Sequence, residues 1–155
     1  MSGASVYSFR SKYVISRTVS RSRSSAGGVT LGPWRSIEHS ASNLELGHAI
    51  SLAIAEASMP WEAPADFLHL LDAALPVAGA KSTRTFERES EVVSLGEDAG
   101  FLMLTAFEHT KRGQLWAPPE RSYSIGSPTD EELGAAVRGA FDQIAANYAL
   151  RGRLP

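Results

Sequence analysis

The sequence predicts an α+β domain in which a mostly antiparallel sheet packs against three main helices. Apolar residues near the N-terminus recur with a period of two, and two later apolar runs flank a glycine-containing turn, as is typical of strands. Three other segments combine helix-capping residues with apolar positions at helical spacing. The chain has 155 residues, 43% of them hydrophobic, enough to bury about two-thirds of its unfolded surface. We therefore expect a single domain over residues 1–155.

The N-terminal region is expected to form one strand, or two strands that break near residues 10–11. Its apolar side chains fall on odd positions, while polar residues fill most even positions. Residues 20–33 are rich in Ser, Arg and Gly, which predicts a flexible loop that ends in a Gly32-Pro33 turn. Trp34 is expected to anchor this loop to the core. The odd-numbered apolar residues are Tyr7, Phe9, Tyr13, Ile15 and Val19.

Two helices are expected next. Ser42 and Glu45 match a capping box, in which each side chain accepts a hydrogen bond from the other residue's backbone N–H. Pro60 ends this first helix, and a second helix is predicted from Pro64 until Pro76 and Gly79 stop it. The first helix is expected to bury Leu46, Ala49, Ile50, Ala53, Ile54 and Ala57, and the second Phe67, Leu70, Leu71 and Ala74.

The middle of the chain is predicted to hold a short helix and a hairpin. Ser82 can cap a short helix that runs through Phe86. Two apolar runs follow, joined by five residues that begin and end with glycine, and this pattern indicates a hairpin. Two weaker strands come after it. The expected strands are residues 92–95, 101–107, 115–116 and 123–125.

The last helix has Ser127 as its expected cap and Pro128 at its first position, followed by acidic residues that suit the positive end of the helix dipole. Gly47 and Gly134 lie inside the first and last helices, where glycine costs roughly 1 kcal/mol relative to alanine. Small alanines follow both glycines, so we expect both helices to pack closely on a shared sheet. The last helix is expected to bury Leu133, Ala136, Val137, Ala140, Phe141, Ile144 and Tyr148.

Composition limits the compartment and the class of partner. The chain has no cysteine, which fits a reducing cytoplasm, and it has neither an export signal nor a long apolar segment. We expect a soluble cytoplasmic protein without a membrane partner.

Residues 1–40 carry six basic side chains and one acidic, whereas the remainder carries nine basic and sixteen acidic. The two regions can neutralise each other in the fold, and an RNA-binding module is an alternative that rests on the basic N-terminal portion.

No catalytic, metal or cofactor site is predicted. The four histidines are isolated in sequence, and His48 and His69 fall outside the apolar stripes, so we expect them to be exposed. Neither a nucleophile elbow nor a glycine-rich phosphate-binding loop is present. A small hydrolase whose carboxylates and histidines meet only in three dimensions stays open as an alternative.

Acidic residues gather in the middle of the chain. Such carboxylates can be solvated charges, an acid–base pair, or a patch that attracts a basic protein, because complementary charges speed encounter and fix orientation. The sequence alone does not separate these three readings. The residues are Glu87, Glu89, Glu91, Glu97 and Asp98.

The order of short motifs resembles that of the immunity proteins of bacterial contact-dependent growth inhibition, the CdiI type. The shared order is an N-terminal strand, a Leu-Gly helix, a second helix, a Lys-Ser segment with Phe four residues later, a valine-rich strand and a C-terminal Leu-Gly helix. Thr83 departs from it, since a bulkier residue is expected there. The matching motifs are Leu46-Gly47, Lys81-Ser82, Phe86, Val92-Val93 and Leu133-Gly134.

The resemblance implies a protein without enzymatic activity, substrate or cofactor. It would bind the C-terminal toxin domain of a cognate exoprotein one to one in the cytoplasm, without direct contact to nucleic acid. Such toxins are frequently nucleases with basic substrate-binding surfaces. The resemblance therefore suggests that the five acidic residues named above face the toxin.

Overall fold

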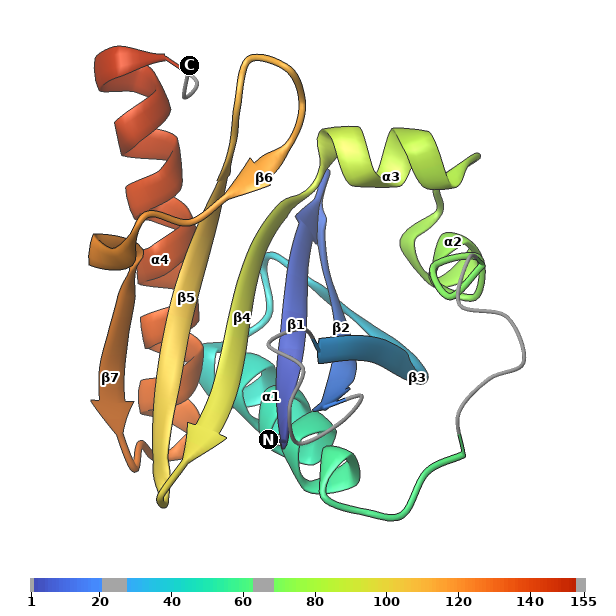
Figure 1. The fold of residues 1–155 in the computed structure, drawn as a ribbon, viewed down its shortest axis with the longest axis vertical. Helices are drawn as coiled ribbons and strands as arrows, with labels where there is room; N and C mark the ends of the chain where they lie inside the picture. The colour runs from blue at the N-terminus through green and yellow to red at the C-terminus, as the bar shows by residue number, and fades with distance from the viewer. Residues whose placement is uncertain (1, 21–27, 63–68, 153–155) are drawn as a thin grey trace.

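The computed structural model describes residues 2–20, 28–62 and 69–152. Within these ranges the chain forms a seven-stranded sheet in which every pair of neighbours is antiparallel, with four α-helices around it (Figure 1). The strand order is β3-β2-β1-β4-β5-β6, and β7 also pairs with β5. The predicted α+β class with its antiparallel sheet is confirmed.

The strands are β1 (Ser2–Phe9), β2 (Lys12–Ser20), β3 (Gly28–Glu38), β4 (Glu91–Asp98), β5 (Phe101–His109), β6 (Leu115–Trp116) and β7 (Ser122–Gly126). The helices are α1 (Asn43–Ala57), α2 (Ala74–Ala78), α3 (Thr83–Glu89), the 3-10 helix η1 (Pro119–Arg121) and α4 (Asp130–Arg151). The predicted hairpin, the two weak strands and the Ser82-capped helix are all present. None of the described helices is long and apolar enough to cross a membrane.

The N-terminal strands break at residues 10–11, as predicted, but their odd positions do not share one face. The two-residue turn places Tyr7 opposite Val14 and Val6 opposite Ile15. Directly opposed residues in an antiparallel pair point to the same face, so odd positions of β1 align with even positions of β2. Both faces are apolar here because each is covered by helices.

The loop expected over residues 20–33 is wrong in part, because Ser20 ends β2 and residues 28–33 belong to β3. Residues 21–27, including two arginines of the basic portion considered for RNA binding, lie outside the described residues. Pro33 is compatible with a strand here because β3 is at the edge of the sheet, where a missing N–H breaks no ladder bond. The pairing register jumps at this point, so the strand bulges. Trp34 is partly buried against Tyr7, with 6.0 Å between ring centroids, which confirms it as an anchor.

The second predicted helix is wrong over its described part. Residues 69–73 form turns and α2 is only five residues long, while residues 63–68 lie outside the described ranges. Pro76 does not stop a helix but lies in the first turn of α2, where a backbone N–H has no partner within the helix. Gly79 ends α2 with a φ of 73°, in the left-handed region that favours glycine.

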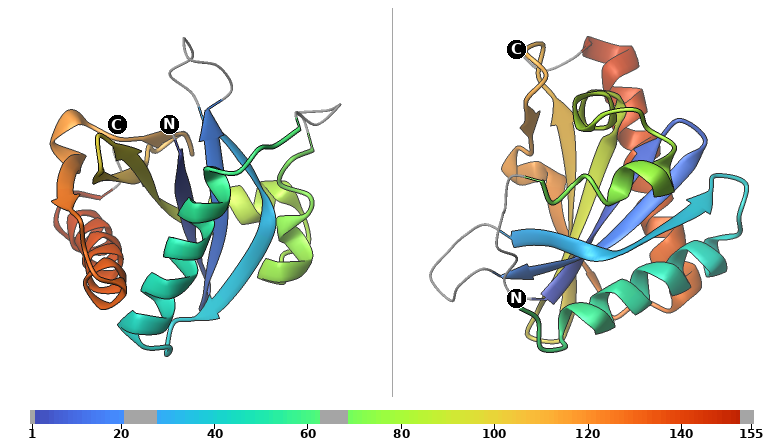
Figure 2. Two further views of the ribbon diagram at one scale, coloured as in Figure 1. Left: turned by 90° about the horizontal axis from the view of Figure 1, so that it is seen from below. Right: turned by 90° about the vertical axis from the view of Figure 1, so that its right-hand side faces the viewer.

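Helices α1 and α4 cover one face of the sheet, and α2 and α3 cover part of the other (Figure 2). The capping box of Ser42 and Glu45 is present. The cap of α4 is Thr129, which forms a second capping box with Glu132, so the prediction of Ser127 was wrong. The Ser127 hydroxyl instead donates to the Gly100 carbonyl. The buried residues of α1 include all those predicted.

The two helix glycines mark a close crossing of α1 and α4. A Cβ atom on Gly47 would lie 1.6 Å from the carbonyl oxygen of Asp130, and one on Gly134 would lie 1.9 Å from the carbonyl oxygen of Asn43. Both helices share one face of the sheet, as expected, but the glycines face the other helix rather than the strands. Each helix therefore begins against the first turn of the other.

Candidate functional site

The five acidic residues expected to face a toxin lie near the two ends of β4. Glu87 and Glu89 belong to α3 and Glu91 opens β4, whereas Glu97 and Asp98 close that strand. An eight-residue strand extends over roughly 23 Å, at about 3.3 Å per residue. The acidic surface is therefore divided into two groups.

Two of these carboxylates are engaged within the protein. Glu89 accepts a hydrogen bond from Arg10 Nε at 3.1 Å, and Glu91 accepts one from the Tyr148 hydroxyl at 3.0 Å. Glu87, Glu97 and Asp98 are exposed. These three side chains are therefore accessible to a partner.

A buried polar cluster, which the sequence did not predict, lies beside the end of β5. His109 is almost fully buried, and its Nε2 lies 2.6 Å from the Ser90 carbonyl oxygen, so Nε2 carries the proton. The backbone N–H of His109 donates to the Tyr148 hydroxyl at 2.6 Å. Glu108 is fully buried, and Arg121 Nε lies 3.3 Å from one of its oxygens. We call Glu91, Glu108, His109, Arg121 and Tyr148 the buried polar cluster.

The buried polar cluster joins β4, β5, η1 and α4. Burial raises the pKa of the Tyr148 phenol, and the negative charge of Glu91 raises it further, so the phenol keeps its proton and can donate to that carboxylate. No group of three or more His, Asp or Glu side chains in the described part of the chain has the spacing to hold a metal ion. The cluster is arranged to fix these elements relative to one another.

A second polar group connects α1 to α4. Asp130 accepts a hydrogen bond from the Ser51 hydroxyl at 2.6 Å, and its other oxygen lies 3.2 Å from His48 Nδ1. The Ser51 hydrogen bond, followed by His48, lowers the pKa of Asp130. Serine and histidine both contact the carboxylate, whereas a catalytic triad needs serine bonded to histidine. His48 and His69 are exposed, as predicted.

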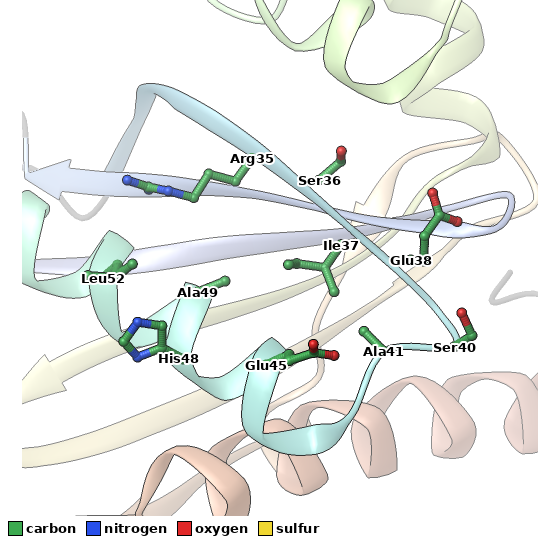
Figure 3. Close-up of a pocket in the computed structure, with 10 residues that line it drawn as sticks. All are labelled: Arg35, Ser36, Ile37, Glu38, Ser40, Ala41, Glu45, His48, Ala49 and Leu52. Atoms are coloured by element: carbon green, nitrogen blue, oxygen red, sulfur yellow. The ribbon is translucent and has the colours of Figure 1, made fainter.

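An apolar groove of about 520 Å³ lies between β3 and α1 (Figure 3). Ile37 of β3 points toward Ala49 of α1, and Leu52 lies further along the helix with 41% of its surface exposed. At one end Arg35 forms a two-point ion pair with Glu56. The sequence reasoning missed this groove, although Leu52, an apolar residue outside the buried stripe of α1, was an available signal.

No protein-family model matches the sequence, and no curated protein matches it. Solved structures with a similar fold include the following two. The Protein of Unknown Function NMB0488 from Neisseria meningitidis matches with a TM-score of 0.73 and 15% identity, over 92% of this chain and 95% of that chain. A chain of the CdiA-CT/CdiI toxin and immunity complex from Yersinia pseudotuberculosis matches with a TM-score of 0.69 and 14% identity, over 92% and 96%. At these identities the likeness concerns the fold, and it supports a CdiI-like fold for this chain.

Proposed function

We propose that this protein is an immunity protein that binds and neutralises the C-terminal toxin domain of a cognate contact-dependent growth inhibition exoprotein. The observation that carries the proposal is the fold shared, over 92% of this chain, with a chain of a toxin and immunity complex. The order of short sequence motifs supports it independently. In this proposal the protein acts in the cytoplasm, binds one toxin domain and catalyses no reaction.

We further propose that the toxin is a nuclease and that the two acidic groups contact its basic surface. A protein–protein footprint of about 800 Å² per partner is roughly 30 Å across, so one toxin can reach both ends of β4. Glu87 at one end and Glu97 and Asp98 at the other, all exposed, would increase the association rate and orient the toxin.

The test begins with the reading frame next to this gene. A large exoprotein that ends in a variable domain supplies the candidate toxin, and that domain is expressed from an inducible promoter in a bacterial host. Co-expression of this protein should restore growth, and the two proteins should co-purify as a one-to-one complex. Growth arrest despite soluble, folded protein would reject the proposed function.

Charge reversal tests the acidic groups separately. Glu87→Lys and the pair Glu97→Lys with Asp98→Lys should each lower the association rate, and the rate should depend less on salt than in the wild type. Glu131→Lys, at an exposed position of α4, is a matched control. Unchanged association kinetics in both variants would remove the acidic groups from the interface.

A further inference from the structure

The turn between β5 and β6 presents a compact exposed surface that neither the fold nor the acidic groups explain. Residues 111–116 are all exposed, and we call them the hairpin tip. The tip carries two cations, Lys111 and Arg112, beside two apolar side chains, Leu115 and Trp116, whose surfaces are 42% and 57% exposed. Figure 1 shows the tip projecting from the end of the sheet at which α3 also lies. Trp and Arg are among the residue types most enriched in binding hot spots.

The bend of the hairpin tip is held in one conformation by three hydrogen bonds. The N–H of Thr110 donates to the Gln114 carbonyl at 2.7 Å, and the N–H of Gly113 donates to the Thr110 carbonyl at 2.9 Å. The N–H of Gln114 donates to the Thr110 hydroxyl at 3.1 Å. Gly113 has a φ of 82°, which a residue with a side chain would adopt only with strain. A preformed loop loses less conformational entropy when it binds.

The base of the hairpin is fixed by the buried polar cluster. Trp116 pairs with Glu108, and Leu115 pairs with His109. Glu108 and His109 are buried residues of that cluster, and they connect the hairpin to Arg121 of η1, to Ser90 just before β4 and to Tyr148 of α4. The two exposed apolar residues therefore stand opposite two strongly anchored residues. The buried polar cluster therefore holds Leu115 and Trp116 in a fixed position at the surface.

We propose that the hairpin tip is the principal anchor for the partner protein, and this inference rests on the proposed function. Trp116 and Leu115 would enter an apolar cleft of the toxin domain, and Arg112 and Lys111 would pair with carboxylates at the rim of that cleft. A protein fits the tip better than RNA does. Nucleic-acid affinity grows with the number of phosphates neutralised, and the tip offers only two cations, while the charges of nearby α3, two arginines and two glutamates, balance each other.

The decisive comparison is Trp116→Ala against Tyr123→Ala. Tyr123 is an aromatic residue of β7 with 44% of its surface exposed, and it pairs with Leu104 in the middle of β5, so both variants remove a half-exposed ring from a strand that pairs with β5. The probe is the toxin domain encoded beside this gene, made inactive by substitution and titrated calorimetrically. Trp116→Ala should weaken binding by about 30-fold or more, the range of a hot spot, and abolish protection of cells. Tyr123→Ala should change binding by less than about threefold, as expected outside a hot spot.

A second variant tests the hairpin tip without removing Trp116, whose loss could affect folding. Lys111→Glu with Arg112→Glu changes only exposed side chains, so its melting temperature should equal that of the wild type, and its toxin affinity should fall about tenfold or more, as for charge pairs at interfaces. If the wild type binds the toxin domain and both tip variants bind it with the same affinity, this inference is overturned and the proposed function still stands. A wild type that neither binds nor protects would overturn both. Binding of a labelled RNA oligonucleotide that the charge-reversed variant loses would also overturn the protein anchor.

Discussion

The crossing of α1 and α4 makes Gly134→Ala the sharpest test of the fold. Alanine normally stabilises a helix interior by about 1 kcal/mol over glycine. At this position the added carbon would lie 1.9 Å from the Asn43 carbonyl oxygen, which belongs to the backbone and cannot rotate away. Overpacking of this kind costs about 3 kcal/mol, at the upper end of its usual range. The net loss should be about 2 kcal/mol, which lowers the melting temperature of a 155-residue domain by roughly 4–8 °C.

Gly139→Ala is the matched control, because it lies on the same helix and a Cβ there meets no atom within 4 Å. It should raise stability by up to about 1 kcal/mol. Gly47→Ala should be destabilising like Gly134→Ala, since its Cβ would lie 1.6 Å from the Asp130 carbonyl oxygen. The double variant should lose less than the sum, because the first substitution already separates the helices. Urea unfolding measures all four variants, and a Gly134→Ala protein as stable as Gly139→Ala would refute the close crossing.

Two further predictions concern buried hydrogen bonds and acid stability. Tyr148→Phe leaves the His109 N–H without its acceptor and should cost about 1–3 kcal/mol in urea unfolding, whereas Tyr123→Phe, at an exposed ring, should cost nothing measurable. Hydrogen bonding from Arg35 lowers the pKa of Glu56 below its ordinary 4.5, and that from Ser51 lowers the pKa of Asp130 below 3.8. At pH values near these pKa values the unfolded chain binds more protons than the folded one. The stabilisation from the two carboxylates is therefore complete above their ordinary pKa values, and it is lost as the pH falls through their lower pKa values in the folded state. Melting temperatures between pH 7 and pH 2 should fall less steeply for Asp130→Asn than for the wild type, and identical slopes would contradict this assignment.

Elements with strong local signals were predicted well from the sequence. The capping box of Ser42 and Glu45, the stripe of α1 and the β4–β5 hairpin depend on residues only a few positions apart. The cap of α4 shows the limit of this reasoning. Ser127 before Pro128 and Thr129 before Glu132 are both valid local signals, and the structure uses the second.

Elements set by distant neighbours were predicted poorly. Gly32 and Pro33 indicate a turn in sequence, yet β3 accommodates them because it is an edge strand with only one partner. The pattern of residues 64–75 resembles a helix, yet only five residues, 74–78, form one, and they pack beneath Phe86 and against β3 and β2. Local propensity cannot decide such cases, because tertiary packing routinely outweighs it.

The candidate interface was the least predictable part. The acids close together in sequence are separated by the length of β4, and two of them already have partners within the protein. In sequence, residues 115–116 suggested only a weak strand. Their exposure opposite buried Glu108 and His109 depends on pairing with β5.

The sequence by itself determined the fold class, most strand and helix positions, the glycine-marked stripes and the resemblance to immunity proteins, because caps, turns and periodicity act between residues near in the chain. Only the tertiary structure decided that the two glycines face each other's helices, that β3 forms an edge, that the acids divide into two groups and that the hairpin tip is exposed above a buried polar cluster. The physical reason is that exposure and partnership depend on which surfaces the fold removes from water, and that follows from contacts between residues far apart in the chain.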